Sequence, residues 1–197
     1  EALFDREIGG RRHYAGVKLS VEPYVDLEGN HQFLFQNKLP EGEGVPDGFI
    51  ESVEHGVLDQ MKSGILMGHA VIGLKVGLVS ADYNELDSTE MGFKAASAMA
   101  LREALMEGES KLLEPIMAVE IVSPEEYMGD ISGDINRRRG LIVGLDDLGS
   151  DKKLKAQVPL SEMFGYSTHL RSRSQGRATF TMEFKNYSES PVPSLNQ

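Results

Sequence analysis

In residues 114–187 the apolar positions follow the period of a strand, then that of a helix, and the order repeats. "EPIMAVEIVS" has an apolar residue at every second position from Met117, which predicts a strand with one buried face. Met128, Ile131 and Ile135 are three and four residues apart, which predicts an amphipathic helix. Two strands follow at "LIVGL" and "KLKAQVPL", joined by the polar turn "DDLGSDKK". "SEMFGYSTHLRS" then predicts a helix and "RATFTMEF" a closing strand.

This order, strand-helix-strand taken twice, predicts a ferredoxin-like βαββαβ sandwich with two helices on one face of an antiparallel sheet. Ser123 is expected to cap the first helix, with Pro124 at the first helical position and Glu126 closing a capping box. Ser161 is expected to begin the second helix. Residues 188–197 are polar and contain proline, so we expect a disordered tail there.

The first 112 residues predict a second, mixed unit. "AGVKLSVEPYV" and "HQFLFQNKL" are typical of strands, with "DLEGN" as the turn between them. A helix is predicted from Pro46 to Met61, followed by a long strand at "AVIGLKVGLVSADY". A second helix, capped by Asp87 with Glu90, is predicted to reach Glu107. The chain is therefore predicted to be an α+β protein with two domains, 1–112 and 113–187.

The composition indicates a packed, acidic protein of 197 residues, 40% hydrophobic, with a formal net charge of −11. The chain has no cysteine, which excludes disulfides and thiolate chemistry and fits a reducing compartment. No apolar run approaches the ~20 residues that cross a membrane. We therefore expect a cytoplasmic protein without a membrane partner. An acidic chain repels polyanions, so any nucleic-acid binding needs local cationic patches.

The sequence contains no motif for catalysis, nucleotide binding or metal binding. Nothing matches the phosphate-binding loop GxxxxGK[ST]. "DISGDINRRRGL" begins like a calcium loop, but Leu141 occupies the position of the bidentate glutamate. The five histidines show no ligand spacing. We expect no catalytic residue, cofactor or metal within this chain.

The densest run of cations is "INRRRG", residues 135–140. Arginines in the last turn of a helix complement its dipole, and Gly140 is a common helix stop. A phosphate-binding role is an equal alternative. With the arginines that follow the second helix, this run is predicted to converge at one end of the domain. Each of these arginines could instead tie a loop to a carboxylate.

Longer strings resemble translation elongation factor G. "LLEPIMAVEI", "PEEYMGDISGDINRRRG" and "VPLSEMFGYSTHLRSRSQGRATFTMEF" resemble its last domain. "GGRRHYAGV", "GVPDGFIESVEHGV" and "DYNELDSTEMGFKAAS" resemble its fourth domain, and the motifs follow the family's order from Gly9 to Tyr187.

The resemblance implies the C-terminal fragment of a ribosomal translocase. A domain that binds GTP and Mg would precede it, and the fourth domain's first strand would lie upstream of Glu1. Residues 1–112 would form an elongated α/β unit with a left-handed βαβ crossover, like domain 2 of ribosomal protein S5. That handedness runs against the usual rule. The parent would be a monomeric, ribosome-stimulated GTPase.

The resemblance also implies two surfaces that contact the ribosome. The tip of the fourth domain would meet tRNA and mRNA in the decoding site. The matching positions are Gly9, Gly10, Arg11, Arg12, His13, Tyr14, Asp82, Tyr83 and Asn84. The last domain would dock on large-subunit rRNA, since guanidinium groups fork onto phosphates. The arginines assigned to that contact are Arg137, Arg138, Arg139, Arg171, Arg173 and Arg177.

Two departures from the family pattern leave other functions open. The usual first loop reads more like GGRGQYGHV, so Arg12 and His13 stand where glycine and glutamine are common. Asn84 follows Tyr83 where histidine is common, and asparagine cannot carry a proton's charge near neutral pH. A paralogue for ribosome recycling or drug protection is one alternative. A free-standing ferredoxin-like enzyme is another, disfavoured by the missing arginine–asparagine constellation at a phosphate loop and by the additional first unit.

Overall fold

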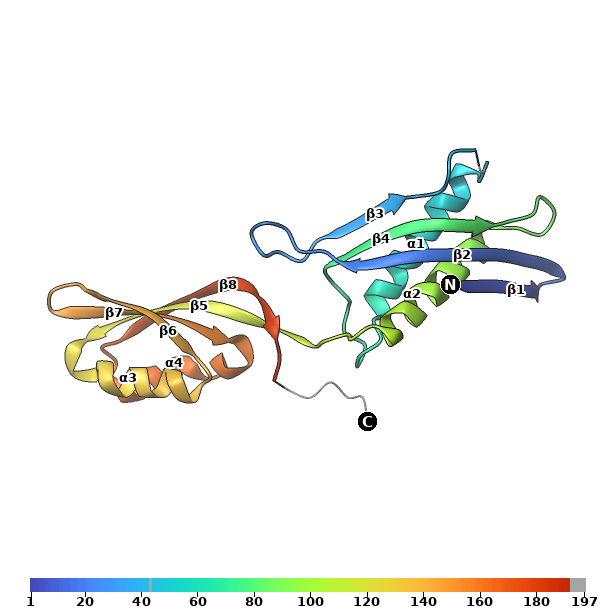
Figure 1. Cartoon of the computed structure of the whole chain (residues 1–197). Helices are drawn as coiled ribbons and strands as arrows, with labels where there is room; N and C mark the ends of the chain where they lie inside the picture. The colour runs from blue at the N-terminus through green and yellow to red at the C-terminus, as the bar shows by residue number, and fades with distance from the viewer. Residues whose placement is uncertain (43, 192–197) are drawn as a thin grey trace. The chain divides into compact units, whose positions relative to one another are not determined.

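The computed structural model describes residues 1–42 and 44–191 and contains two compact units, each with its own four-stranded sheet and core (Figure 1). The first unit runs from Glu1 to Ser110, and the second begins at Lys111. The predicted α+β class with two domains is confirmed.

The first unit is a sheet with two helices on one face. Its elements are β1 (Ala2–Ile8), β2 (Arg11–Pro23), β3 (Phe33–Asn37), α1 (Asp47–Ser63), β4 (Leu74–Asp82) and α2 (Glu90–Glu107). The strand order is β1-β2-β4-β3, with β3 and β4 parallel and the other pairs antiparallel. In Figure 1, β3 and β4 both run from left to right, and α1, which connects them, lies behind the sheet. The crossover is therefore left-handed, as the resemblance implied.

The helices of the first unit lie very close together. α2 presents Phe93, Ala96 and Ala100 to the core, and all three are at most 1% exposed. On the facing side of α1, a Cβ atom added to Gly56 would lie closer than 3.0 Å to both the Lys94 carbonyl and the Ser97 hydroxyl. Small residues at this crossing therefore determine how near the two helices approach.

The second unit has the predicted βαββαβ order. Its elements are β5 (Leu113–Pro124), α3 (Glu125–Arg137), β6 (Leu141–Asp147), β7 (Asp151–Pro159), the short 3₁₀ helix η1 (Leu160–Met163), α4 (Tyr166–Arg173) and β8 (Thr179–Glu189). The strand order is β6-β7-β5-β8, and every pair is antiparallel. Both α-helices lie on one face of the sheet (Figure 1). The ferredoxin-like prediction is confirmed.

The predicted start of α2 is wrong by two residues. Thr89, not Asp87, is the N-cap, and its hydroxyl oxygen accepts a hydrogen bond from the Gly92 N–H at 3.1 Å. The backbone carbonyl oxygen of Asp87 accepts a hydrogen bond from the Tyr14 N–H of β2 at 2.9 Å instead of from the first turn of the helix. Asp87 therefore lies outside the helix, in a contact with β2.

The predicted starts of the two helices of the second unit are also wrong. Pro124 is the N-cap residue of α3, no side chain caps this helix, and the Ser123 hydroxyl donates to the Pro124 carbonyl. Ser161 lies within η1, and α4 begins only after Gly165, whose φ of 71° is left-handed. The predicted single helix is thus a 3₁₀ turn followed by a short α-helix.

The sheet edges also differ from the predictions. The strand that pairs with β2 on its outer side is β1, which the sequence pattern did not predict. Ser188 and Glu189 were assigned to the tail, yet both pair with β5 as part of β8. The rest of the predicted tail from Val192 onward lies outside the described residues.

Candidate nucleic-acid interface

A tight hairpin forms the first of the two predicted tip segments. Gly9 and Gly10, with φ values of 63° and 79°, make a two-residue turn between β1 and β2, and Ile8 pairs with Arg11 across it. Two successive left-handed residues are the reason that glycine is preferred in such turns. β4 ends at Asp82, opposite Gly16, so the hairpin extends past the end of its neighbour in the sheet.

The second tip segment, the β4–α2 loop, lies beside this hairpin. The Tyr14 hydroxyl donates to the Asp82 carboxylate, and Tyr14 also bridges to Ser88. Both segments therefore lie at one end of the unit, which is the right-hand end in Figure 1. The structure brings the predicted tip residues together.

Two of these tip residues build the loop itself. The Asn84 side-chain oxygen accepts from the backbone N–H groups of Leu86, at 3.1 Å, and Asp87, at 2.7 Å. The Tyr83 ring packs edge-on against Phe49 with 6.0 Å between ring centroids, and its hydroxyl donates to the Gly44 carbonyl at 2.9 Å. The Asn84 side-chain oxygen therefore shapes the turn.

Arg12 connects the hairpin to the loop. Its Nε and Nη2 donate to the two carboxylate oxygens of Asp5 at 2.8 and 2.7 Å, and its Nη1 donates to Asp87 at 3.3 Å. The guanidinium carbon also lies 5.8 Å from the centre of the Tyr14 ring. The hydrogen bond from Arg12 lowers the pKa of Asp5 below its ordinary value, so this carboxylate stays ionised at pH values where a free aspartate begins to protonate.

His13 faces the start of α2. Its Nδ1 lies 2.7 Å from the Thr89 hydroxyl, the same group that caps the helix. The neighbouring Arg11 is exposed, and its side chain makes no hydrogen bond or ion pair with the residues that the structure describes. Of the three consecutive polar residues Arg11, Arg12 and His13, only Arg11 has a side chain without such a contact within the described residues.

Thr89→Ala is expected to destabilise the first unit by about 1 kcal/mol, the usual effect of losing an N-cap side chain. The hydroxyl is also the only described side-chain partner of His13, so the hairpin should loosen as well. Urea unfolding gives the first effect and amide hydrogen exchange at residues 11–14 the second. Thr89→Ser keeps the hydroxyl and should restore both. If Thr89→Ala and Thr89→Ser behave alike, the hydroxyl has no role.

Most of the arginines in the second unit are held by carboxylates. Asp134, only 6% exposed, accepts from Arg138 Nε at 2.9 Å and pairs with Arg173 at 3.8 Å. Arg139, with a φ of 58°, pairs with Glu114 at the start of β5.

Arg177 reaches the opposite end of α3. It donates to Glu126 at 2.6 Å and lies 5.8 Å from the centre of the Tyr127 ring. The predicted convergence is therefore found in part. Arg138 and Arg173 meet at Asp134, and Arg139 lies 3.8 Å from the carboxylate of Glu162, whose backbone carbonyl accepts from Arg138. Arg177 does not join them. The side chains of Arg137 and Arg171 make no hydrogen bond or ion pair with any described residue.

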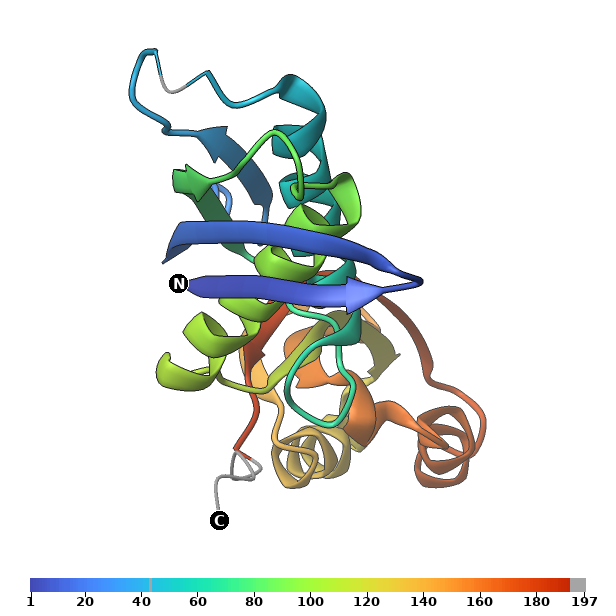
Figure 2. The ribbon, with the colours of Figure 1, turned by 90° about the vertical axis from the view of Figure 1, so that its right-hand side faces the viewer.

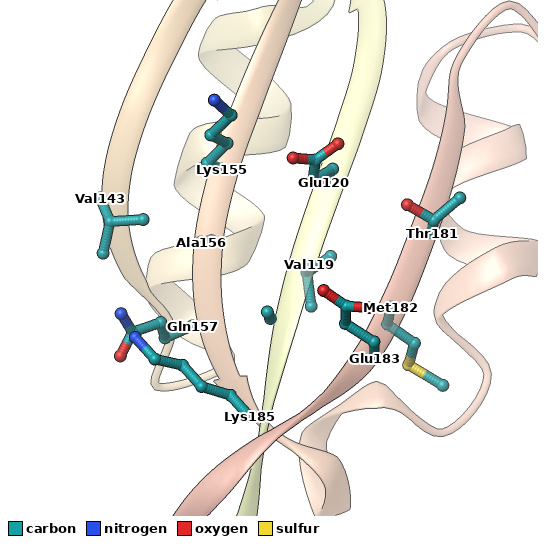
Figure 3. Close-up of a pocket in the computed structure, with 11 residues that line it drawn as sticks. Val119, Glu120, Val143, Lys155, Ala156, Gln157, Thr181, Met182, Glu183 and Lys185 are labelled. Atoms are coloured by element: carbon teal, nitrogen blue, oxygen red, sulfur yellow. The ribbon is translucent and has the colours of Figure 1, made fainter. Parts of the chain in front are cut away.

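The sheet of the second unit also carries a shallow groove of about 600 Å³ that the sequence did not predict (Figure 3). Two lysines and two glutamates line it: Lys155, Lys185, Glu120 and Glu183. Because these charges balance, the groove offers no preference for a polyanion. Within residues 1–42 and 44–191 there is also no cluster of three or more His, Asp or Glu side chains that could hold a metal ion. No described helix is both long and apolar enough to cross a membrane.

Comparison with known proteins assigns both units. Residues 1–109 match the family described as "Elongation factor G, domain IV", and residues 111–197 match "Elongation factor G C-terminus". A crystal structure of a protein from Thermus thermophilus is 31% identical in sequence to this chain, of which it covers 97%, with a TM-score of 0.87. The chain spans 28% of the length of that protein. Two units of these folds, in this order, define part of a translation elongation factor. The chain belongs to the elongation factor G family.

Proposed function

We propose that this chain is the C-terminal part of a ribosomal translocase. In this proposal the tip of the first unit contacts tRNA and mRNA in the decoding site, and the second unit docks on large-subunit rRNA. The match of both units to consecutive domains of elongation factor G carries the proposal. A GTPase domain elsewhere in the parent protein binds GTP and Mg, and this chain supplies no catalytic residue. The parent acts in the cytoplasm as a monomer.

The geometry of the tip supports its part in this function. The hairpin extends past β4, and the Gly9–Gly10 turn leaves Arg11 exposed at its end. In the second unit, Arg137 and Arg171 have guanidinium groups without a described partner, as docking on RNA phosphate requires. Arg138, Arg139, Arg173 and Arg177 already have carboxylate partners, so we assign them mainly to holding the fold.

Replacing Arg11 and Arg12 together with glutamine is expected to slow tRNA–mRNA movement about tenfold, or roughly 1.4 kcal/mol in the transition state. GTP hydrolysis on the ribosome should stay near the wild-type rate, because the hydrolysing domain is separate. Rapid-mixing measurements of translocation and hydrolysis on the intact protein test this. Arg102→Gln, on the exposed side of α2, is the control. Equal translocation rates for wild type and the double variant would refute the role of the tip.

A second candidate is a paralogue that acts in ribosome recycling or drug protection. One feature of the tip favours such a paralogue. Arg12 forms ion pairs with Asp5 and Asp87, and the glycine that is common at this position in the family could not form them. Subunit splitting, measured beside translocation with the same preparation, separates the two functions. The free-standing enzyme has no support, since both units match elongation factor G.

A further inference from the structure

The two strands of the tip hairpin present different chemistry on their two faces. Side chains alternate along a strand, and Ala15 and Val17 of β2 are buried toward the helices. Arg11 and His13 point to the same side of β2 as Ala15 and Val17, and Arg6 and Ile8 are their partners across the β1–β2 pair. These four side chains form the helix face of the hairpin. The side chains that point to the other side of the two strands form its open face: Asp5, Glu7, Arg12 and Tyr14.

The open face is acidic. Its contacts with the β4–α2 loop add the carboxylates of Asp82 and Asp87 to those of Asp5 and Glu7. Arg12 is the single cation among these four carboxylates. A phosphate that approached this face would meet an excess of negative charge, so the open face disfavours RNA.

Arg12 is poorly placed to bind a phosphate. Its Nε and one N–H on each terminal nitrogen already donate to Asp5 and Asp87. A bidentate contact with a phosphate would require the guanidinium to leave Asp5, which holds it in the same fork geometry. What this arrangement does is fasten β1, β2 and the β4–α2 loop to one another.

The helix face has the opposite character. Arg6 and Arg11 are exposed, and neither side chain makes a hydrogen bond or ion pair with the described residues. Arg6 only lies over the Phe4 ring, with 5.7 Å from the guanidinium carbon to the ring centre. Between them Ile8 is 47% exposed. The turn lies beyond the start of α2 (Figure 2), so the helix does not cover this end of the face.

We propose that the helix face of the hairpin is the surface that contacts RNA, with Arg6 and Arg11 on phosphates and Ile8 against the sugar surface between them. Arg12 is a positioning residue, which holds the hairpin at the angle that presents this face. The inference rests on the proposed function only in that the RNA is ribosomal or ribosome-bound.

The salt dependence of ribosome binding by the intact protein distinguishes contact from positioning. Affinity falls as salt rises, and removing one phosphate contact reduces the magnitude of the slope of log affinity against log salt by about one. Arg11→Gln and Arg6→Gln should each do so, and Arg102→Gln, outside the hairpin, should not. Arg12→Gln should weaken binding severalfold while leaving the slope unchanged. A shallower slope for Arg12→Gln, with an unchanged slope for Arg6→Gln and Arg11→Gln, would overturn the proposal.

A double-mutant cycle gives a second, independent test of Arg12. If Arg12 acts through Asp5, then Asp5→Asn should weaken binding as Arg12→Gln does, and the double variant should be no weaker than either single one. If Arg12 itself contacts RNA, Asp5→Asn would free it and strengthen binding, which would contradict the positioning role. If the wild-type protein bound ribosomes but did not move tRNA and mRNA, the proposed translocase function would be refuted. The inference about the helix face would still be tested, because the affinities of the variants for the ribosome would remain measurable.

Discussion

Asp134→Ala is expected to destabilise the second unit by about 3 kcal/mol, since removing one partner of a buried ion pair leaves the other charge uncompensated. The Asp134 side chain is 8% exposed, and its carboxylate pairs with Arg138, whose side chain is 15% exposed, and with Arg173. Without it, the Arg138 guanidinium would remain 4.9 Å from the centre of the buried Tyr166 ring with only the Glu162 carbonyl as a polar partner.

Tyr166 makes this site still less tolerant of the loss. Its hydroxyl is buried and has no hydrogen-bond partner among the residues that the structure describes. Burial, followed by the nearby Asp134 carboxylate, raises the pKa of this hydroxyl, so Tyr166 stays neutral and cannot replace the missing negative charge.

Urea unfolding of wild type and Asp134→Ala, followed by a signal from the second unit, measures this effect. Asp130→Ala is the matched control, because Asp130 lies on the same helix, is exposed and has no described partner. We expect the control to change stability by less than about 0.5 kcal/mol. A loss below about 1 kcal/mol for Asp134→Ala would mean that water replaces the carboxylate easily, and the assignment of Arg138 and Arg173 to the fold would fail.

The order of elements in the second unit could be predicted because β5, β7 and α3 each bury one side. Val119 and Ile121 face the core at the spacing of a strand, and Ile131 and Ile135 at that of a helix. β1 could not be found in the same way. It is an edge strand in which only Ala2 is buried, so most of its length carries no apolar pattern.

The candidate sites were predicted less completely, because sequence spacing does not show which charges are already paired. Arg138 has a partner one helical turn away at Asp134, but Arg139 pairs with Glu114, on a different element. Arg12 likewise depends on Asp87, which the chain brings close only after three strands and a helix. The family resemblance located the tip, and only the three-dimensional contacts separate its free cation Arg11 from its paired cation Arg12.

Replacing a helical glycine with alanine is expected to have opposite effects at Gly56, in the close helix crossing of the first unit, and at Gly129, in the second unit. Gly56→Ala would place a methyl group against the backbone of α2 at Lys94, where no flexible side chain can move aside. Gly129→Ala, in α3, would meet no atom within 4 Å. Overpacking costs ~1–3 kcal/mol, whereas an exposed helical glycine gains up to ~1 kcal/mol on replacement by alanine.

We therefore expect Gly56→Ala to destabilise the first unit by about 3 kcal/mol, at the upper end of overpacking, and Gly129→Ala to stabilise the second slightly. The first change should also reach the tip, because α2 carries Thr89, and Thr89 holds His13. Urea unfolding with separate signals for the two units measures both stabilities, and hydrogen exchange at residues 11–14 reports on the hairpin. If Gly56→Ala were as stable as wild type, α1 and α2 could separate at little cost. The helix pair would then not be the rigid support that the tip requires.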